Sequence, residues 1–506
     1  MKLIQSLKLF VNRRVFNMLF LGFSSGVPIL LIFSTLGLWL NEAGVVKSTI
    51  TYFSWAALGY SFKFVWAPLV DQLPLPVLTQ LLGRRRSWML VSQLAIIGSI
   101  LMMSSIDPKT SMESLTLMAY GSVLLGFSSA TQDIVIDAYR IESAQRDSQS
   151  MLSATYIAGY RIGMLVASAG GLFMASYFGS TKESYSYDAW SATYIIMALI
   201  MFVGVATTLF IDEPKTSKKY TEYTILDYSR FFMLFLFVVL SFILIYVATN
   251  PFGKIANVSL TEIFGNKQLS GFIVGSSRMI LALLVSYLVA LVLTKLNVVN
   301  RSMFNNTYLE PVKDFFKRYG MNVSILLLAI IGLYRVSDIV LGVVANIFYQ
   351  DMGFSKVEIA AASKTFGLFM TISGGFFGGI LAIRIGIYKV FFLGALLSAA
   401  TNLLFVILAN LGHDIAWLYI TITMDNFSAG IAGAAFIAFL SSLTNIQFTA
   451  VQYAIFSSLM TLIPKIFGGY SGSLVMEYGY SKFFIITTLI GLPILWLVYK
   501  IKPYLS

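Results

Sequence analysis

The sequence predicts an all-helical membrane protein built from two six-helix bundles, with two additional helices between them. Of its 506 residues, 58% are hydrophobic and only 11% are charged, and the mean hydropathy is +0.80, which excludes a soluble globular domain. Apolar runs long enough to cross about 30 Å of hydrocarbon recur along the chain. A weak internal repeat divides most of these runs into two sets of six.

Fourteen segments are expected to span the membrane as helices. The first apolar run is longer than the core of a secretory signal peptide and has no small-residue cleavage site after it, so it is predicted to be the first spanning helix. The expected spans are 16–40, 49–71, 87–106, 113–138, 153–178, 190–211, 231–250, 271–295, 322–349, 357–383, 388–410, 415–441, 450–476 and 483–499.

Lys and Arg residues gather in alternate loops, and this asymmetry predicts the orientation. One set of loops holds 22 of them and the other set holds seven. Because basic residues are retained on the cytoplasmic side, both termini are expected to be cytoplasmic. The net charge of +12 therefore reflects orientation in a lipid bilayer, and no nucleic-acid partner is expected.

Two pairs of segments indicate the internal repeat. NEAGVVKSTI (41–50) aligns without gaps with QDMGFSKVEI (350–359), and FSSATQDIVIDA (127–138) aligns with FSAGIAGAAFIA (427–438) with three identities. The matches occur in the same order, so spans one to six and nine to fourteen are expected to form parallel halves. Such symmetry is typical of major facilitator transporters, which bind substrate between the halves near the middle of the membrane.

The expected domains are an N-terminal bundle (1–211), a central region with two extra helices (212–321) and a C-terminal bundle (322–506). In the central region, the segment EPVKDFFKRYG (310–320) places two Phe residues among basic ones. It is either a short helix on the inner membrane surface or an ordinary basic linker. A monomer is expected.

The composition argues against several chemistries. The chain has no cysteine, and its single histidine, His413, is predicted to lie in a loop between spans. These counts leave no thiolate ligand, no thiol nucleophile and no histidine within a span for catalysis. Neither a metal, nor a cofactor, nor an enzymatic activity is therefore predicted.

Seven charged residues are predicted deep inside the spans, which favours a transport function. At roughly 2.5 to 3.5 kcal/mol each, isolated charges at the bilayer centre would together cost about 18 to 25 kcal/mol. They must therefore face one another or a hydrated cavity that handles a polar solute. The seven are Lys63, Asp133, Arg161, Arg335, Asp338, Asp425 and Lys465.

Three basic residues are candidate substrate contacts. Arg161 in GYRIG and Lys465 in LIPKIFG occupy comparable places in the two halves, and Lys63 lies in the second span. Two cations that face one cavity repel each other when it is empty and are satisfied by an anionic ligand, whose carboxylate an Arg can hold with two hydrogen bonds. The alternative is that each cation pairs with a carboxylate and holds helices together.

The second half holds further candidates. Arg335 and Asp338 are three residues apart on one helix, so they can form a local ion pair, which is either structural or part of a gate. Asp425 is a candidate partner for a substrate hydroxyl or amine, and equally a candidate partner for Lys465. These alternatives stay open at this point.

Asp133 and Asp137 lie one helical turn apart in ATQDIVIDAYR (130–140), on the helix face that also carries Arg140. The second half has glycine and isoleucine at these places, so the common bundle does not require the carboxylates. Burial and a neighbouring cation act in opposite directions on the protonation of Asp133, as a proton carrier requires. Asp137 is expected to form a gate or ion pair with Arg140, and Gln132 is a further candidate substrate contact.

The loop after the second span carries a small residue, then Asp71 four residues later, and, after an insertion, Gly83 followed by Arg84 and two more arginines. The pattern resembles the loop signature of major facilitator transporters, which implies that Asp71 pairs across the cytoplasmic face and locks one conformation. Asp71 and Arg84 are therefore predicted gating residues. The chain departs from the signature at Gln72, where a basic residue is usual, and by the insertion of 73–82.

Six segments together resemble the AmpG-type muropeptide permeases: GFSSGVPILL (22–31), FKFVWAPLVDQ (62–72), GRRRSW (83–88), ATQDIVIDAYR, AGYRIGMLVAS (158–168) and GLYRVSDIVLG (332–342). The resemblance covers both halves and is weakest in the central pair of helices. It implies an inner-membrane permease of Gram-negative bacteria that imports 1,6-anhydro-muropeptides, which are small glycopeptides, together with protons. Such import serves peptidoglycan recycling and influences β-lactam resistance. The related acetyl-coenzyme A transporters, which also carry a large anion, are the alternative.

Overall fold

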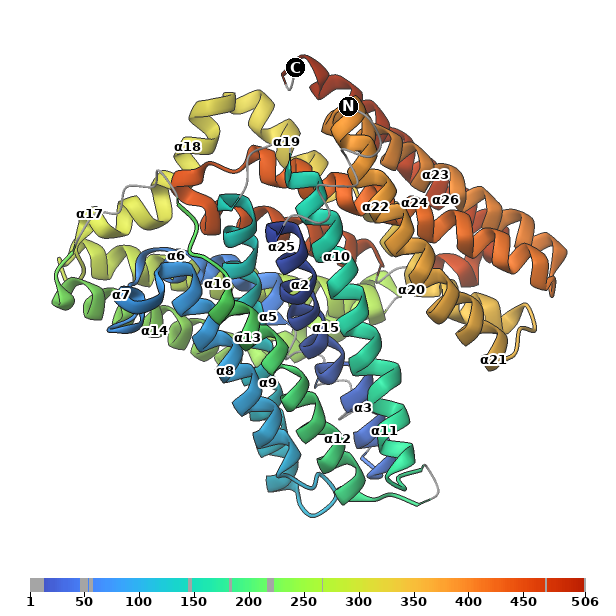
Figure 1. Ribbon diagram of the computed structural model, residues 1–506, viewed down its shortest axis with the longest axis horizontal. Helices are drawn as coiled ribbons and strands as arrows, with labels where there is room; N and C mark the ends of the chain where they lie inside the picture. Colours follow the sequence, from blue (N-terminus) through green and yellow to red (C-terminus); the bar gives the residue numbers. More distant parts are fainter. Residues whose placement is uncertain are drawn as a thin grey trace. The chain divides into compact units, whose positions relative to one another are not determined.

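The computed structural model describes residues 13–45, 53, 58–143, 148–181, 184–215, 223–265, 267–468 and 471–504, and no β-strand occurs within these ranges. The chain divides into two compact units, one formed by Met1–Lys218 with Phe315–Ser506 and the other by Lys219–Asp314. The first unit contains both six-helix halves, and the second contains the extra helices (Figure 1).

Half one of the first unit runs from α2 to α13. Its continuous spans are α8 and α9, whereas its other spans are interrupted. The elements are α2 (Arg13–Ile32), α3 (Ser34–Glu42), α5 (Leu58–Phe62), the 3-10 turn η2 (Lys63–Val65), α6 (Ala67–Gln72), α7 (Leu78–Leu82), α8 (Arg84–Ser104), α9 (Met112–Glu142), α10 (Gln149–Leu165), the π-helical turn η4 (Val166–Gly170), α11 (Gly171–Tyr177), α12 (Tyr187–Ile200) and α13 (Phe202–Phe210).

Half two of the first unit runs from α19 to the end of the described chain. The elements are α19 (Met321–Leu333), α20 (Val336–Asp351), α21 (Lys356–Ile359), the π-helical turn η6 (Ala360–Phe366), α22 (Gly367–Ile385), α23 (Ile387–Leu411), α24 (Ile415–Leu443), η7 (Ile446–Phe448), α25 (Thr449–Gly468), α26 (Ser471–Ile501) and η8 (Lys502–Tyr504). The element α26 holds two helices joined at Gly479, whose φ of 77° and ψ of 167° are not helical, so the predicted break between the last two spans is present at this residue.

The second unit is built on α14 (Ile225–Ala248), α15 (Asn250–Phe264) and α16 (Lys267–Lys295), followed by α17 (Arg301–Phe304) and the π-helical turn η5 (Asn305–Leu309). Arg278 of α16 binds the end of α14. Its Nη2 donates to the carbonyl oxygen of Tyr246 at 2.6 Å, and its guanidinium lies over the Tyr246 ring. A cation at the last turn of a helix satisfies carbonyl groups that lack a partner within that helix.

The segment EPVKDFFKRYG forms α18 (Glu310–Tyr319), which joins the two units along the chain. Phe315 is buried against the ring of Phe456 in half two, and Arg318 donates to the carbonyl oxygen of Leu443. The prediction of a helix here is therefore right. At least one of its two Phe side chains packs into the protein and is unavailable to the membrane surface.

Twelve helical stretches among the described residues are long and apolar enough to cross a membrane. Each corresponds to one of the fourteen predicted spans. The two predicted spans outside this set are 49–71, which lies partly outside the described residues, and 113–138, which forms the continuous helix α9. Helix α9 is less apolar because its second half carries the two aspartates and their polar neighbours.

The two halves repeat the same turns at aligned positions. Gly44 after α3 and Gly353 after α20 both have positive φ, +81° and +89°, a conformation that glycine adopts without a steric penalty. Likewise Gly83 and Gly386, at φ +86° and +90°, immediately precede the third span of each half. Two weakly similar sequences therefore build the same connections.

Close contact between helices depends on glycines spaced four residues apart. A Cβ added at Gly26 of α2 would lie 2.0 Å from the carbonyl oxygen of Tyr160, and one at Gly159 of α10 would lie 1.9 Å from that of Leu19. Helices α2 and α10 consequently run side by side with their backbones in contact (Figure 1). In half two, α22 and α24 approach each other in the same way at Gly374.

The arginine-rich segments of half one meet at one end of the bundle. Arg13 donates to the carbonyl oxygen of Phe210 at 2.8 Å, Arg14 donates to that of Ser143 at 2.9 Å, and Arg86 donates to the end of α13. We call this end of the first unit the basic end. Loops that the charge pattern assigned to one side of the membrane thus lie together.

The halves contact each other near the basic end. Helix α10 packs against α22 and α24, and α25 packs against α5, α6 and α9. Ser150 Oγ donates to the carbonyl oxygen of Gly379 at 3.4 Å, and Arg140 Nη1 donates to Ser441 Oγ at 2.8 Å. The first bond joins the start of α10 to half two, and the second joins the end of α9 to half two.

A single added methyl group tests the α2–α10 contact. We expect Gly159→Ala to lower the free energy of unfolding by about 1 to 3 kcal/mol or more, because the new Cβ collides with backbone atoms that cannot move independently. Gly98→Ala in α8 is the matched control: its Cβ meets nothing within 4 Å, and alanine favours a helix by up to about 1 kcal/mol. Thermal unfolding of the purified protein in detergent measures both. Equal stability of the two variants would contradict the contact.

Candidate substrate-binding site

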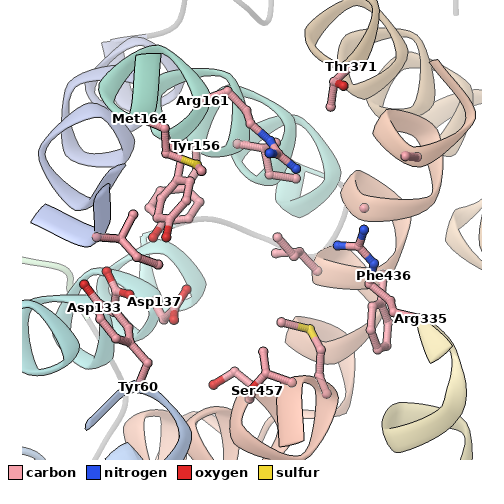
Figure 2. A pocket seen from close by; sticks show the side chains of 18 of the residues that line it. Tyr60, Asp133, Asp137, Tyr156, Arg161, Met164, Arg335, Thr371, Phe436 and Ser457 are labelled. Atoms are coloured by element: carbon pink, nitrogen blue, oxygen red, sulfur yellow. The ribbon is translucent and has the colours of Figure 1, made fainter. Parts of the chain in front are cut away.

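A cavity of about 390 Å³ lies between the two halves, within the size range of small-molecule sites. Half one contributes side chains from α2, α5, η2, α9 and α10, and half two contributes them from the α19–α20 junction, α22, α24 and α25. Figure 2 shows Asp133, Asp137 and Tyr156 on one side of the cavity and Arg335 on the opposite side, with Arg161 reaching in from α10.

Three lining residues lie where a helix is interrupted. Phe33 separates α2 from α3 with φ −97° and ψ −92°, Lys63 opens the 3-10 turn η2, and Arg335 separates α19 from α20 with φ −103° and ψ 9°. Broken backbone within a membrane is tolerated where it lines a cavity. The first helix of each half is interrupted at its cavity residue, so the breaks belong to the site.

The acidic side of the cavity contains one ion-paired carboxylate and one that is not paired. Lys63 Nζ lies 3.4 Å from Asp137 Oδ2, with both side chains less than a tenth exposed, and Arg140 Nη2 lies 3.5 Å from Asp137 Oδ1. Asp133 is buried one turn deeper, and its Oδ1 has no hydrogen-bond partner among the described residues. Lys63, a sequence candidate for the neighbour of Asp133, therefore forms its ion pair with Asp137.

Arg140 connects this charge network to half two. It is fully buried, and its Nη1 donates to Ser153 Oγ at 3.0 Å and to Ser441 Oγ at 2.8 Å, while its guanidinium lies over the ring of Tyr453. The lining contributed by α9 ends at Asp137, one turn before Arg140. The Arg140 contacts therefore lie between the cavity and the basic end.

Tyrosines form much of the remaining acidic side, and the sequence analysis missed them. Tyr60 donates to Ser129 Oγ at 2.6 Å, and the rings of Tyr156 and Tyr160 lie 6.1 Å apart on α10. Their sequence signal was available: two tyrosines one turn apart directly precede Arg161. Aromatic faces and hydroxyls of this kind can pack against and hydrogen-bond a sugar.

Arg161 and Arg335 are the exposed cations of the cavity wall. Arg161 makes no hydrogen bond or ion pair with the described residues, and it lines the cavity from α10. Arg335 lies 3.7 Å from Asp338, measured from Nε to Oδ2, and this Nε has no hydrogen-bond partner among the described residues. The three-residue spacing of Arg335 and Asp338 does bring them together, though beyond hydrogen-bonding distance.

The profile of the Major Facilitator Superfamily matches residues 15–309 of the chain. A Rickettsia conorii protein named "Putative transporter AmpG 4" is 31% identical over 97% of this chain and 97% of its own length. The chain belongs to the major facilitator superfamily. Within it, the chain is an AmpG-type family member and a transporter. "Putative transporter AmpG 1" of Rickettsia prowazekii is 28% identical over 98% of this chain and 99% of its own.

Solved structures agree with the major facilitator fold. The proton:xylose symporter XylE bound to 6-bromo-6-deoxy-D-glucose superposes with a TM-score of 0.58, at 12% identity, over 96% of this chain and 94% of that chain. At this identity the likeness concerns the fold alone. The two-bundle architecture with extra helices, predicted from the sequence, is therefore the right fold class.

Of the residues predicted to contact substrate in this AmpG-type transporter, Gln132 and Asp425 are not among the described residues that line the cavity. Gln132 is fully buried, and its Nε2 donates to Ser25 Oγ at 3.4 Å, so it serves the contact between α9 and α2. Asp425 lies on α24 one turn before the lining residue Ala429, where it interacts electrostatically with Asp338 and Arg335. Lys465 lies on α25, but its side chain is outside the described residues.

The loop signature of the family forms a buried ion-pair cluster in half one. Asp71 Oδ1 lies 2.8 Å from Arg85 Nη2, which also lies 2.6 Å from Glu142 Oε1, and all three side chains are buried. Arg84, the other predicted gating residue, donates to the backbone carbonyl oxygens of Asp71 and Gln72. Arg85 lies in the first turn of α8, and its side chain reaches Glu142 at the end of α9 as well as Asp71.

Replacing Arg140 tests whether its contacts close the basic end. A lysine keeps a positive charge near Asp137 but lacks the planar fork, whose Nη1 reaches Ser153 and Ser441 while Nη2 faces Asp137. In Arg140→Lys we expect about tenfold faster labelling, from the basic-end side, of a cysteine placed at the cavity residue Ser457, because one charge-assisted bond between the halves is lost. The chain has no native cysteine to interfere.

Arg318→Lys is the matched control for this measurement. Arg318 lies at the same end, but its bonds to Leu443 and Gln452 fall within half two. We expect its labelling rate to stay within about twofold of the parent. Equal acceleration in both variants would mean that general loosening, rather than the Arg140 contact, opens this end.

Proposed function

We propose that this transporter imports anhydro-muropeptides, coupled to protons, across the bacterial inner membrane. The observation that carries the proposal is a cavity between the halves that holds a carboxyl group with no ion-pair partner among the described residues, Asp133, together with two arginines that reach into the cavity. Its relatives carry the AmpG name, and five of the six family-like segments, all except GRRRSW, supply residues on both sides of this cavity. Transport without chemical change of the solute is proposed, rather than catalysis.

The chemistry of a muropeptide suits the cavity. Such a molecule carries several carboxylates, an amine and many hydroxyls. Arg161 and Arg335 offer guanidinium donors to carboxylates, and the tyrosine-rich side offers rings and hydroxyls to a sugar. Lys63 would join them only after leaving Asp137, and Lys465 is kept as a candidate from its place in the sequence.

In the proposed coupling, Asp133 carries the proton and Asp137 with Arg140 closes the basic end. Asp133 is buried and its Oδ1 has no hydrogen-bond partner among the described residues, which makes the charged form costly, so its charge depends on what else occupies the cavity. Lys63 can neutralise the charge of one of the two aspartates more fully than that of the other. Binding of substrate or of a proton would change how this neutralisation is divided between them. Linkage of this kind makes proton and substrate bind together.

The proposed orientation places the basic end in the cytoplasm, with both termini on that side. The support is the gathering of Arg13, Arg14 and the Arg84–Arg86 segment at this end, combined with the excess of basic residues in the same set of loops. Solute would then enter from the periplasm and leave when the Arg140 contacts open.

Uptake into proteoliposomes tests the substrate. We expect labelled anhydro-muropeptide to accumulate when the lumen is alkaline relative to the outside, and excess unlabelled muropeptide to compete. Acetyl-coenzyme A is the decisive second competitor. Uptake of labelled acetyl-coenzyme A without uptake of muropeptide would replace the proposed substrate with the alternative anion.

Replacing Asp133 tests the coupling. Asp133→Asn keeps the size of the side chain but cannot exchange a proton, so we expect it to retain substrate binding and exchange of labelled for unlabelled muropeptide. It should lose at least about 90% of the accumulation driven by an imposed pH difference, because that step requires the carboxyl proton. Proteoliposome exchange and accumulation, measured side by side, separate the two outcomes.

Asp137→Asn is the control for this experiment. It removes the carboxylate that pairs with Lys63 and Arg140, so we expect slower turnover in both assays but accumulation that still responds to pH. If Asp133→Asn concentrates substrate as well as the parent does, the proton is carried elsewhere and Asp133 has another role.

A further inference from the structure

Two arginines from different halves reach into the same cavity. Arg161 extends from α10 of half one, and Arg335 extends from the α19–α20 break of half two (Figure 2). Each guanidinium has five N–H donors in a rigid fork. Among the described residues, neither side chain forms a hydrogen bond, so these donors are available to a ligand in the cavity.

A structural role does not account for this arrangement. Arg161 has no carboxylate partner among the described residues, although a buried arginine that holds helices together requires one. Arg335 has Asp338 at 3.7 Å, too far for a hydrogen bond, and 27% of its side chain stays exposed. Buried stabilising arginines of this protein look different: Arg85 is almost fully buried and bonds two carboxylates.

We propose that Arg161 and Arg335 form a two-sided anion site, in which each guanidinium binds a different carboxylate of one ligand. The proposal rests on the transport function given above and narrows its substrate class to molecules with at least two separated negative groups. A bidentate Arg–carboxylate contact on each side would satisfy both forks and remove the repulsion between the two cations.

Asp338 is a positioning residue for this site. It lies three residues after Arg335 on α20, close enough to hold the guanidinium toward the cavity but not close enough to occupy its donors. Arg335 is held in place by the helix break between α19 and α20. Arg161 is held in place by α10, whose glycines pack that helix against α2. Both cations are thus fixed to the frame of their own half.

The placement has a mechanistic consequence. Because one arginine belongs to each half, a ligand with two carboxylates contacts both halves at once, whereas a ligand with one carboxylate contacts only one cation. Differential contact of this kind favours the state in which the halves enclose the ligand. The site would therefore select for charge number as well as for size.

The test compares three probes on the purified full-length protein. They are an anhydro-N-acetylmuramyl peptide with two free carboxylates and the two versions in which one or the other carboxylate is a primary amide. We expect the parent protein to bind the two-carboxylate probe about 10- to 100-fold more tightly than either amide. Arg335→Gln should lose a similar factor for the two-carboxylate probe but less than about threefold for one of the amides.

Arg161→Gln should show the same pattern with the other amide, and Arg335→Lys should fall between Arg335→Gln and the parent because an ammonium cannot bind bidentately. Arg384→Gln, at the exposed end of α22, is the matched control and should bind all three probes as the parent does. Thermal unfolding of each variant identifies those that are folded. Equal losses for all three probes, or no loss, in folded Arg161→Gln or Arg335→Gln would overturn the two-sided site.

Failure of the proposed substrate gives a different result. If the parent protein binds no muropeptide but binds acetyl-coenzyme A, the import proposal is wrong, and the same variants are then measured with that anion. Loss of affinity for that anion in both arginine variants would support the two-sided site, and unchanged affinity would contradict it. If the parent protein binds neither anion, both proposals are wrong.

Discussion

A charge inside the hydrocarbon region needs a partner or water, and this constraint organises the centre of the molecule. Lys63, Asp137 and Arg140 meet it by sharing one network across two spans, which Arg140 then extends to half two. Arg161 and Arg335 meet it by facing a cavity. The same requirement that makes these residues costly in a membrane also brings them to the interface between the halves, where a solute can replace water.

The frame around these charges comes from close backbone contact. Glycines on α2 and α10 remove the side chains that would keep the two helices apart, and the opposite face of α10 then presents Tyr156, Tyr160 and Arg161 to the cavity. Interrupted helices supply the rest, because Lys63 and Arg335 leave the backbone where it is not regular α-helix. Rigid contacts and local breaks together fix where each charge lies.

The two halves share connections but differ in chemistry. Glycine turns recur after the first span and before the third span of each half, as a repeated architecture requires. Along the fourth span of each half, however, α9 carries Asp133 and Asp137, whereas α24 presents Gly433 and Ile437 to the same cavity. The two carboxylates are therefore present only in half one, on a backbone architecture that both halves share. The functional differences between the halves follow from side chains of this kind.

The sequence by itself determined the apolar spans, the two halves, the family and the set of deep charges, because hydropathy and residue spacing act within single helices. Only the tertiary structure decided the pairings: Asp71 with Arg85, Lys63 with Asp137, and an arginine of each half in one cavity. Partners such as these come from different helices. Which side chains meet depends on how each helix is rotated about its axis and where it is interrupted. Glycine contacts between helices and the interrupted turns set these rotations and breaks through packing in three dimensions.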